Sequence, residues 1–241
     1  MVAPAWAQKK SKKAVSEPAP AAQPAAENKP ETPRDSVKID PMMAHFIRKY
    51  STALAWNDYD VAKDALYDLI VENPGNDSLI YDLAVFYYER QKYASSVLVG
   101  QELLSRNPKN LPALEIVASG YENLGIADRA LQTYESMYLL TNTTGSLYKM
   151  AFLQFDLKRF KEAATSADIL LTKPELETTK VVFNDAQNKP KEYTMKVAVL
   201  NLRGMIELEN GNKPNAKKWF DQALAAAPDF VPAKQNLNKT K

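Results

Sequence analysis

The sequence predicts an all-α solenoid, a fold in which similar helix–turn–helix units stack on one another. Three observations predict it. Pro74, Pro108 and Asn142 lie 34 residues apart. Each closes a stretch with the apolar periodicity of two amphipathic helices. Small residues recur at the same place in successive stretches. Such a fixed period marks a repeat whose units bury their apolar faces only by stacking, so the period indicates the fold.

The composition is that of an ordinary globular chain of 241 residues, with 45% apolar and 25% charged residues. Its 31 basic and 29 acidic side chains give a formal net charge of +2. This balance is too even for the positive field on which nucleic-acid binding depends. No run approaches the length of apolar sequence that a membrane-spanning helix needs. The absence of cysteine excludes disulfides, thiolate metal sites and a lipid anchor on cysteine.

Residues 1–40 are predicted to form a disordered tail rich in Ala, Pro and Lys, because they carry too little apolar surface to offset the entropy of ordering. Ala5-Trp6-Ala7, followed by Gln8, resembles the small-residue end of a secretory signal peptide. We therefore expect an exported protein, soluble in the periplasm and not a lipoprotein. The alternative is a cytoplasmic protein that begins with an Ala/Pro-rich tail.

The solenoid is expected to occupy residues 41–241, and Asp40-Pro41 has the N-cap acceptor and first-turn proline of a helix start. The first three units place their turns at residues 57–59, 91–93 and 124–127, and their close helix crossings at Ala62, Ser96 and Ala130. Gly125 suits a turn with positive φ. The fourth unit has its turn at residues 157–160 and its crossing at Ala163. Its closing Pro174 comes 32 residues after Asn142, which predicts a slightly short second helix.

An insertion of about 20 residues, at about residues 178–197, separates the fourth unit from the last. Residues 180–183 and 193–197 are rich in β-branched and aromatic side chains, and residues 184–191 carry turn formers. A continuous helix would place Pro190 in its interior at a cost of about 3 kcal/mol. We therefore expect a β-hairpin. The fifth unit contains the small residues Gly204 and Ala216, and residues 229–237 are expected to add a short closing helix.

The units resemble the tetratricopeptide repeat (TPR) family, and the resemblance covers nearly everything from Met42 to the end. It implies a right-handed superhelical solenoid of about five units with the hairpin before the last one. The chain is also similar to exported TPR proteins of Gram-negative, Bacteroidetes-like bacteria. The resemblance implies a non-enzymatic adaptor or scaffold for protein–protein interactions in the bacterial cell envelope. The alternative is a chaperone-like carrier that binds exported polypeptides transiently.

In the TPR family the first helix of each unit lines a concave surface, and the side chains on that surface come from fixed places in the repeat. The resemblance implies that the same places face the concave surface here. These places hold Tyr81, Val85, Tyr88, Glu89, Glu115, Ser119, Glu122, Tyr148, Phe152 and Phe155. Aromatic side chains offer large, stiff contact areas, and carboxylates beside them favour cations. We expect a protein or peptide partner that is apolar with basic residues. The alternative is that these aromatic side chains pack between successive first helices.

Motifs for chemistry are absent from the sequence. His45 is the only histidine, so neither a Ser-His-Asp triad elsewhere in the chain nor a site of several histidines is supported. Seven glycines are spread without a phosphate-binding loop. We predict no catalytic residue, no cofactor and no metal. The hairpin could offer a strand edge to a partner or pack on the solenoid, and packing is favoured. The oligomeric state is not predicted.

Overall fold

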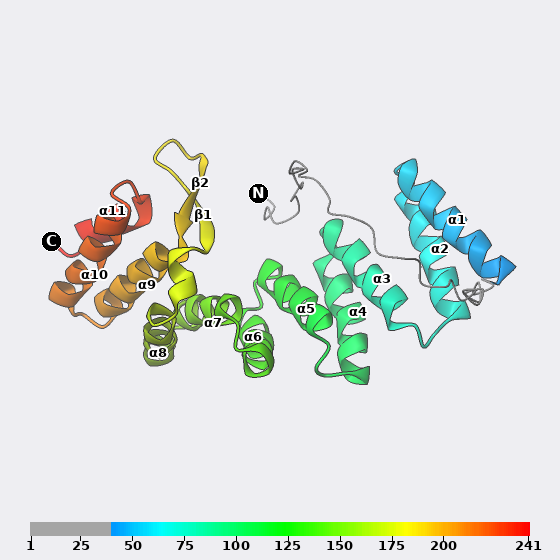
Figure 1. Cartoon of the computed structure of the whole chain (residues 1–241), viewed down its shortest axis with the longest axis horizontal. Coiled ribbons are helices and arrows are strands. Elements are labelled where there is room, and N and C mark those ends of the chain that lie inside the picture. Colours follow the sequence, from blue (N-terminus) through cyan, green and yellow to red (C-terminus); the bar gives the residue numbers. More distant parts are fainter. Residues whose placement is uncertain (1–39) are drawn as a thin grey trace, which may run out of the picture. The chain divides into compact units, whose positions relative to one another are not determined.

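The computed structural model describes residues 40–241, drawn in colour in Figure 1. These residues form eleven α-helices, one 3-10 helix (η1, Pro174–Glu177) and two strands. The helices are α1 (Pro41–Ala55), α2 (Tyr59–Glu72), α3 (Asp77–Glu89), α4 (Tyr93–Arg106), α5 (Leu111–Asn123), α6 (Ala127–Thr141), α7 (Thr144–Asp156), α8 (Phe160–Leu171), α9 (Met195–Glu209), α10 (Lys213–Ala226) and α11 (Val231–Asn238). The export motif and the tail of residues 1–39 lie outside the described residues.

Five helix pairs repeat along the chain: α1 with α2, α3 with α4, α5 with α6, α7 with α8, and α9 with α10. The predicted all-α solenoid of five helix–turn–helix units is confirmed, and α11 packs on α9 and α10 as the expected closing helix. Helix α8 has 12 residues, whereas the other second helices have 14 or 15, so the short fourth unit is also confirmed.

Small side chains let the two helices of each unit cross closely. The five predicted or corresponding crossing residues are fully buried: Ala62, Ser96, Ala130, Ala163 and Ala216. The Ser96 hydroxyl donates to the carbonyl oxygen of Ala84 at 2.8 Å, which satisfies the one polar group among them. A β-carbon at Gly204 would lie 2.3 Å from an atom of the Phe220 ring, so only glycine fits at that crossing.

The turn inside each unit is made by a residue in the left-handed conformation. These residues are Asn57, Gln91, Gly125, Lys158 and Gly211, with φ between 58° and 78°. The positive φ expected at Gly125 is confirmed. The following residues occupy the N-cap positions of the second helices, and two of them cap with their side chains. The Asp58 carboxylate accepts from the backbone N–H of Val61 at 3.2 Å, and the Asn212 side-chain oxygen accepts from that of Asn215 at 3.4 Å. At the start of the solenoid, the Asp40 carboxylate accepts from the backbone N–H of Met42 at 2.7 Å.

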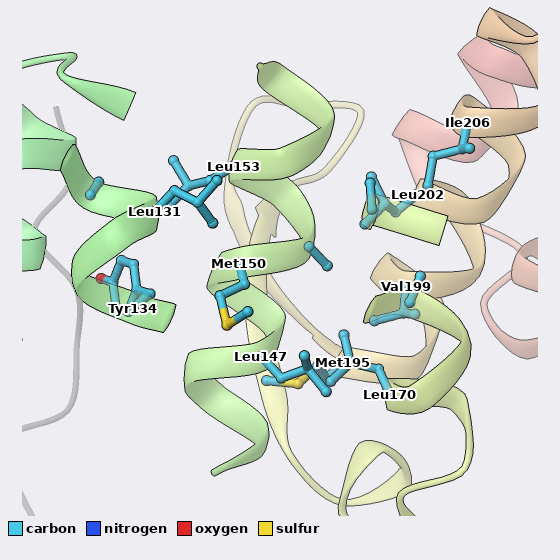
Figure 2. Close-up of a cluster of buried hydrophobic side chains, with 14 of the residues drawn as sticks. Leu131, Tyr134, Leu147, Met150, Leu153, Leu170, Met195, Val199, Leu202 and Ile206 are labelled. Atoms are coloured by element: carbon cyan, nitrogen blue, oxygen red, sulfur yellow. The ribbon is translucent and has the colours of Figure 1, made fainter. Parts of the chain in front are cut away.

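Apolar side chains of neighbouring units form a core that continues from one unit to the next. Figure 2 shows Leu131 and Tyr134 of α6 facing Leu147, Met150 and Leu153 of α7. Leu170 of α8 and the α9 residues Met195, Val199, Leu202 and Ile206 complete this cluster. Among residues 40–241, no helix is both long enough and apolar enough to cross a membrane.

The insertion forms the expected β-hairpin, with β1 (Lys180–Asn184) pairing antiparallel with β2 (Pro190–Thr194). The predicted second strand, residues 193–197, was placed too late in the chain. Thr194 is the N-cap of α9, and Met195 and Val197 are buried core residues of that helix rather than strand residues. Pro190, expected in the turn, is the first residue of β2 and pairs with Asn184 at the end of the ladder. Proline is tolerated at this position because a first strand residue can lack the N–H.

The hairpin packs on the last unit, as the favoured interpretation expected. The ring centroids of Phe183 and Tyr193 lie 5.0 and 4.9 Å from that of Phe230, which is fully buried between α10 and α11. Lys191 and Tyr193 both hydrogen-bond to the Asp229 carboxylate. Helix α11 is further joined to α9 by the buried Asn236 amide, which donates to the Asn201 side-chain oxygen at 3.1 Å.

Candidate functional site

The ten predicted site residues lie on the first helices of three consecutive units. We call this set the first-helix face. Helix α3 carries Tyr81, Val85, Tyr88 and Glu89; α5 carries Glu115, Ser119 and Glu122; α7 carries Tyr148, Phe152 and Phe155. Glu89 and Glu115 are exposed and the other eight are partly buried. The aromatic side chains are therefore neither fully in the core nor fully in solvent.

On α3, the inner sides of Tyr81, Val85 and Tyr88 pack against a cluster that includes Ala84, Val97, Ile116 and Val117. The Tyr88 hydroxyl accepts a hydrogen bond from the Asn123 amide at 3.1 Å, which links α3 to α5. Its ring makes an edge contact with Tyr93, with 5.3 Å between centroids. Packing thus fixes these side chains, and a fixed side chain loses little entropy when a ligand binds.

On α7, the rings of Tyr148 and Phe152 lie 4.6 Å apart, and those of Phe155 and Phe160 lie 5.5 Å apart. Tyr148, Phe152 and Phe155 border the core cluster shown in Figure 2. Burial raises the pKa of Tyr148, so this phenol stays neutral in the physiological range. The α7 part of the first-helix face is an aromatic, uncharged surface.

Glu122 is not a free carboxylate. Tyr134 of α6 donates to it at 2.7 Å, and the Lys149 ammonium of α7 lies 2.9 Å away. Burial and the adjacent Glu122 carboxylate together raise the pKa of Tyr134. Lys149 occupies the place directly after Tyr148, one residue away from the places that the repeat pattern singles out. One of the carboxylates expected to attract cations, Glu122 on α5, is therefore already paired within the protein.

Three carboxylates on α3, α5 and α7 have no hydrogen bond or ion pair within residues 40–241: Asp82, Glu115 and Asp156. Burial raises the pKa of Asp82 and of Asp156, because a partly desolvated carboxylate is less stable when ionised. Burial first, and then the charges of Glu115 and Asp82, raise the pKa of the Tyr81 phenol. Asp82 and Glu115 therefore lie close enough to Tyr81 to influence its hydroxyl. A cation beside the Tyr81 hydroxyl would be attracted by both carboxylates.

The two best-formed clefts of the described residues lie elsewhere. One, of about 390 Å³, lies beside His45, Arg48 and Trp56 at the first unit. The other, of about 320 Å³, lies between α2 and α4. No group of three or more Asp, Glu or His residues within residues 40–241 is arranged to hold a metal ion. The first-helix face is an open surface, a form that suits a polypeptide segment better than a small molecule.

The fold is shared with solved structures at low sequence identity. The chain is similar to YrrB, described as a TPR protein with an unusual peptide-binding site, with a TM-score of 0.61 and 12% identity over 79% of this chain and 89% of YrrB. It is similar to MamA, with a TM-score of 0.59 and 13% identity over 77% of this chain and 91% of that one. For residues 41 to the end of MamA from Desulfovibrio magneticus RS-1, the TM-score is 0.59 at 10% identity, covering 80% of this chain and 98% of that one.

The chain therefore has the TPR-repeat fold, and the similarity at these identities extends to the fold alone. No family model matches the chain, and no curated protein matches its sequence.

Proposed function

We propose that this protein is a non-enzymatic adaptor that binds a protein or peptide segment on its first-helix face. The observation that carries the proposal is the combination of partly buried aromatic side chains with the unpaired carboxylates of Asp82, Glu115 and Asp156 on the same helices. Fixed aromatic side chains provide contact area at low entropic cost, and carboxylates without an internal partner can pair with a cation of the ligand. The partner is therefore apolar with basic residues.

The fold supports the same function, because repeat solenoids offer extended surfaces to their partners. YrrB, which has the same fold, is described as having a peptide-binding site. The chemistry of this chain's surface sets its own preference. Its α7 part, with Tyr148, Phe152 and Phe155, is aromatic, whereas Tyr81 on α3 lies near Glu115 of the same face and Asp82 next to it in sequence. A bound segment would place its apolar residues on α7 and a lysine or arginine beside Tyr81.

The test is crosslinking in cells followed by mass spectrometry, with a charge reversal as the variant. Glu115 is exposed and has no partner within residues 40–241, so Glu115→Lys should leave the fold unchanged. Asp221→Lys on α10 is the matched control, because Asp221 is equally exposed and lies on the second helix of the last unit. Partners lost with Glu115→Lys and kept with Asp221→Lys support the proposal. An unchanged partner set contradicts it.

We further propose that the adaptor works in the bacterial cell envelope, as a scaffold of an assembly there. The supporting observation is the sequence pattern Ala5-Trp6-Ala7-Gln8, which matches the end of a secretory signal. Cell fractionation of the native protein tests the location, and recovery only with cytoplasmic markers contradicts it. A stable complex of fixed composition in detergent extracts supports a scaffold. Weak, salt-sensitive binding to many basic and apolar peptides would instead support a transient carrier of exported polypeptides.

A further inference from the structure

A second apolar surface lies between the second helices of the first two units. Its cleft of about 320 Å³ has Ile80 and Leu83 of α3 at its base, with Tyr67 and Ile70 of α2 on one side and Leu98 and Val99 of α4 on the other. Glu102 and Arg106 line it at α4. Of its lining residues, Leu98 is 68% exposed and Tyr67 is 42% exposed, and Val71, one helical turn after Tyr67 on α2, is 71% exposed. Three large apolar side chains are thus held partly or largely in solvent beside one cleft.

Stacking of the units does not require these apolar residues. One repeat later, the residues 34 positions after Tyr67, Val71 and Leu98 are Gln101, Ser105 and Gln132, all polar. The side-chain contact persists, because the Gln101 amide donates to the Tyr121 hydroxyl at 2.7 Å where Tyr67 bonds to the Tyr87 hydroxyl at 2.9 Å. Helices α4 and α5 even pack more closely than α2 and α3, so close stacking is reached with the polar set. The apolar set at the first junction exceeds what the fold requires, and such an exposed patch marks an interaction site.

The charge around the cleft indicates the chemistry of its partner. The two charged residues that line the cleft, Glu102 and Arg106, pair with each other, so the net charge beside it comes from α2. Helix α2 alone carries Asp60, Asp64, Asp68 and Glu72 against one lysine, Lys63. Asp64 and Asp68 share the ammonium of Lys49, so this surface stays acidic after its internal ion pairs are counted. Basic side chains at the edge of a partner would complement it.

We propose that the α2–α4 cleft binds an amphipathic helix with a ridge of apolar side chains flanked by lysine or arginine. A groove between two helices, with a third helix as its base, receives a helix by ridge-into-groove packing. The apolar ridge would cover Tyr67, Val71 and Leu98, and the basic flanks would lie over the carboxylates of α2. This surface is formed by second helices, so it is distinct from the first-helix face and can be occupied at the same time.

The test measures fluorescence anisotropy of a labelled model helix, a peptide of leucine and lysine with leucine on one helical face, added to the full chain. A peptide of the same composition in scrambled order and one with glutamate for lysine are the peptide controls. The protein variant is Tyr67→Gln with Leu98→Gln, which copies the residues at the next junction. Leu139→Gln on α6 is the matched control, because Leu139 is 85% exposed and lies on another unit.

We expect the leucine–lysine peptide to bind, the two control peptides to bind about tenfold or more weakly, and the double variant to weaken binding by about tenfold. Leu139→Gln should leave affinity unchanged. Circular dichroism checks the variants, and Val71→Ser replaces the double variant if that one loses helicity. Absence of binding, equal effects of the double variant and Leu139→Gln, or loss of binding on Tyr81→Ala instead would each overturn the proposal.

Discussion

Gly100 of α4 lies directly against Val117 of α5: a β-carbon at Gly100 would come within 2.5 Å of a Val117 methyl carbon. The contact is reciprocal, since a β-carbon at Gly120 of α5 would come within 2.5 Å of a methyl carbon of Val97 on α4. Each glycine thus receives a valine of the neighbouring unit. These four residues set how closely the second unit packs on the third.

The first prediction concerns this contact. Gly100→Ala should lower the free energy of unfolding by about 1 to 3 kcal/mol, because the added methyl group overpacks a closed helix contact. Urea unfolding measures the change. Val117→Ala in the same chain should recover part of the loss. Gly145→Ala on α7 is the control, because a β-carbon there meets nothing within 4 Å, and it should be neutral or stabilising. Equal losses at Gly100 and Gly145 would show that the close packing is not the cause.

The second prediction concerns the turns. Gln91 and Lys158 hold the left-handed conformation at φ 58°, which glycine adopts without strain and other residues adopt at a cost. Gln91→Gly and Lys158→Gly should each raise the free energy of unfolding by about 0.5 to 1 kcal/mol. Glycine removes the backbone strain of the folded state, and this gain is partly offset because glycine also raises the entropy of the unfolded chain. The control is Lys92→Gly, at φ −85°, which should give no gain. A gain at Lys92 as large as at Gln91 would contradict the strain argument.

The third prediction concerns the ion pair of Glu122 and rests on the proposed function. Lys149→Ala should free this carboxylate and strengthen the binding of basic peptides about two- to fivefold, the range expected for a partly exposed pair. Lys161→Ala on α8 removes an exposed positive charge that has no ion pair within residues 40–241, and it should change affinity less. Peptide titrations at two salt concentrations measure both. Equal gains would mean that net charge alone governs binding.

The fourth prediction concerns pH. Burial raises the pKa of Asp82, so the folded chain binds this proton more tightly than the unfolded chain does. Ionised Asp82 therefore opposes folding above its raised pKa. This destabilisation decreases as the pH falls through the pKa of Asp82 in the folded chain, and it is gone below the pKa of Asp82 in the unfolded chain. Asp82→Asn should raise the melting temperature at pH 7 and give no gain at a pH below both values. A gain of the same size at both pH values would contradict the assignment.

Much of the fold could be predicted because its signals are local and repeated. Pro74, Pro108 and the small crossing residues mark each unit within the chain itself, and Gly125 marks a turn. The second strand was predicted too late because the β-branched and apolar residues around Met195 suit a strand and a buried helix equally well. Packing against the core favours the helix, in which Met195 and Val197 are buried.

The candidate site was predicted only in outline. The repeat pattern gives the places on α3, α5 and α7, and the structure shows what each side chain contacts there. The repeat pattern does not predict the ion pair of Glu122 with Lys149, because these residues are 27 positions apart on different helices. The repeat pattern does not predict the cleft between α2 and α4 either, because the cleft depends on the distance between two helices that are not consecutive in the chain.

The aromatic contacts of Phe230 bear on how the solenoid opens. Units in such a stack are held only by their neighbours, so a terminal helix ordinarily frays before the middle of the array. Here α11 follows Phe230, whose ring is held by Phe183 and Tyr193 of the hairpin. Detaching α11 therefore also requires breaking the contacts of Phe230 with the hairpin. Backbone amides of α11 should exchange with deuterium as slowly as those of α10, and the C-terminal units should unfold together as one cooperative block.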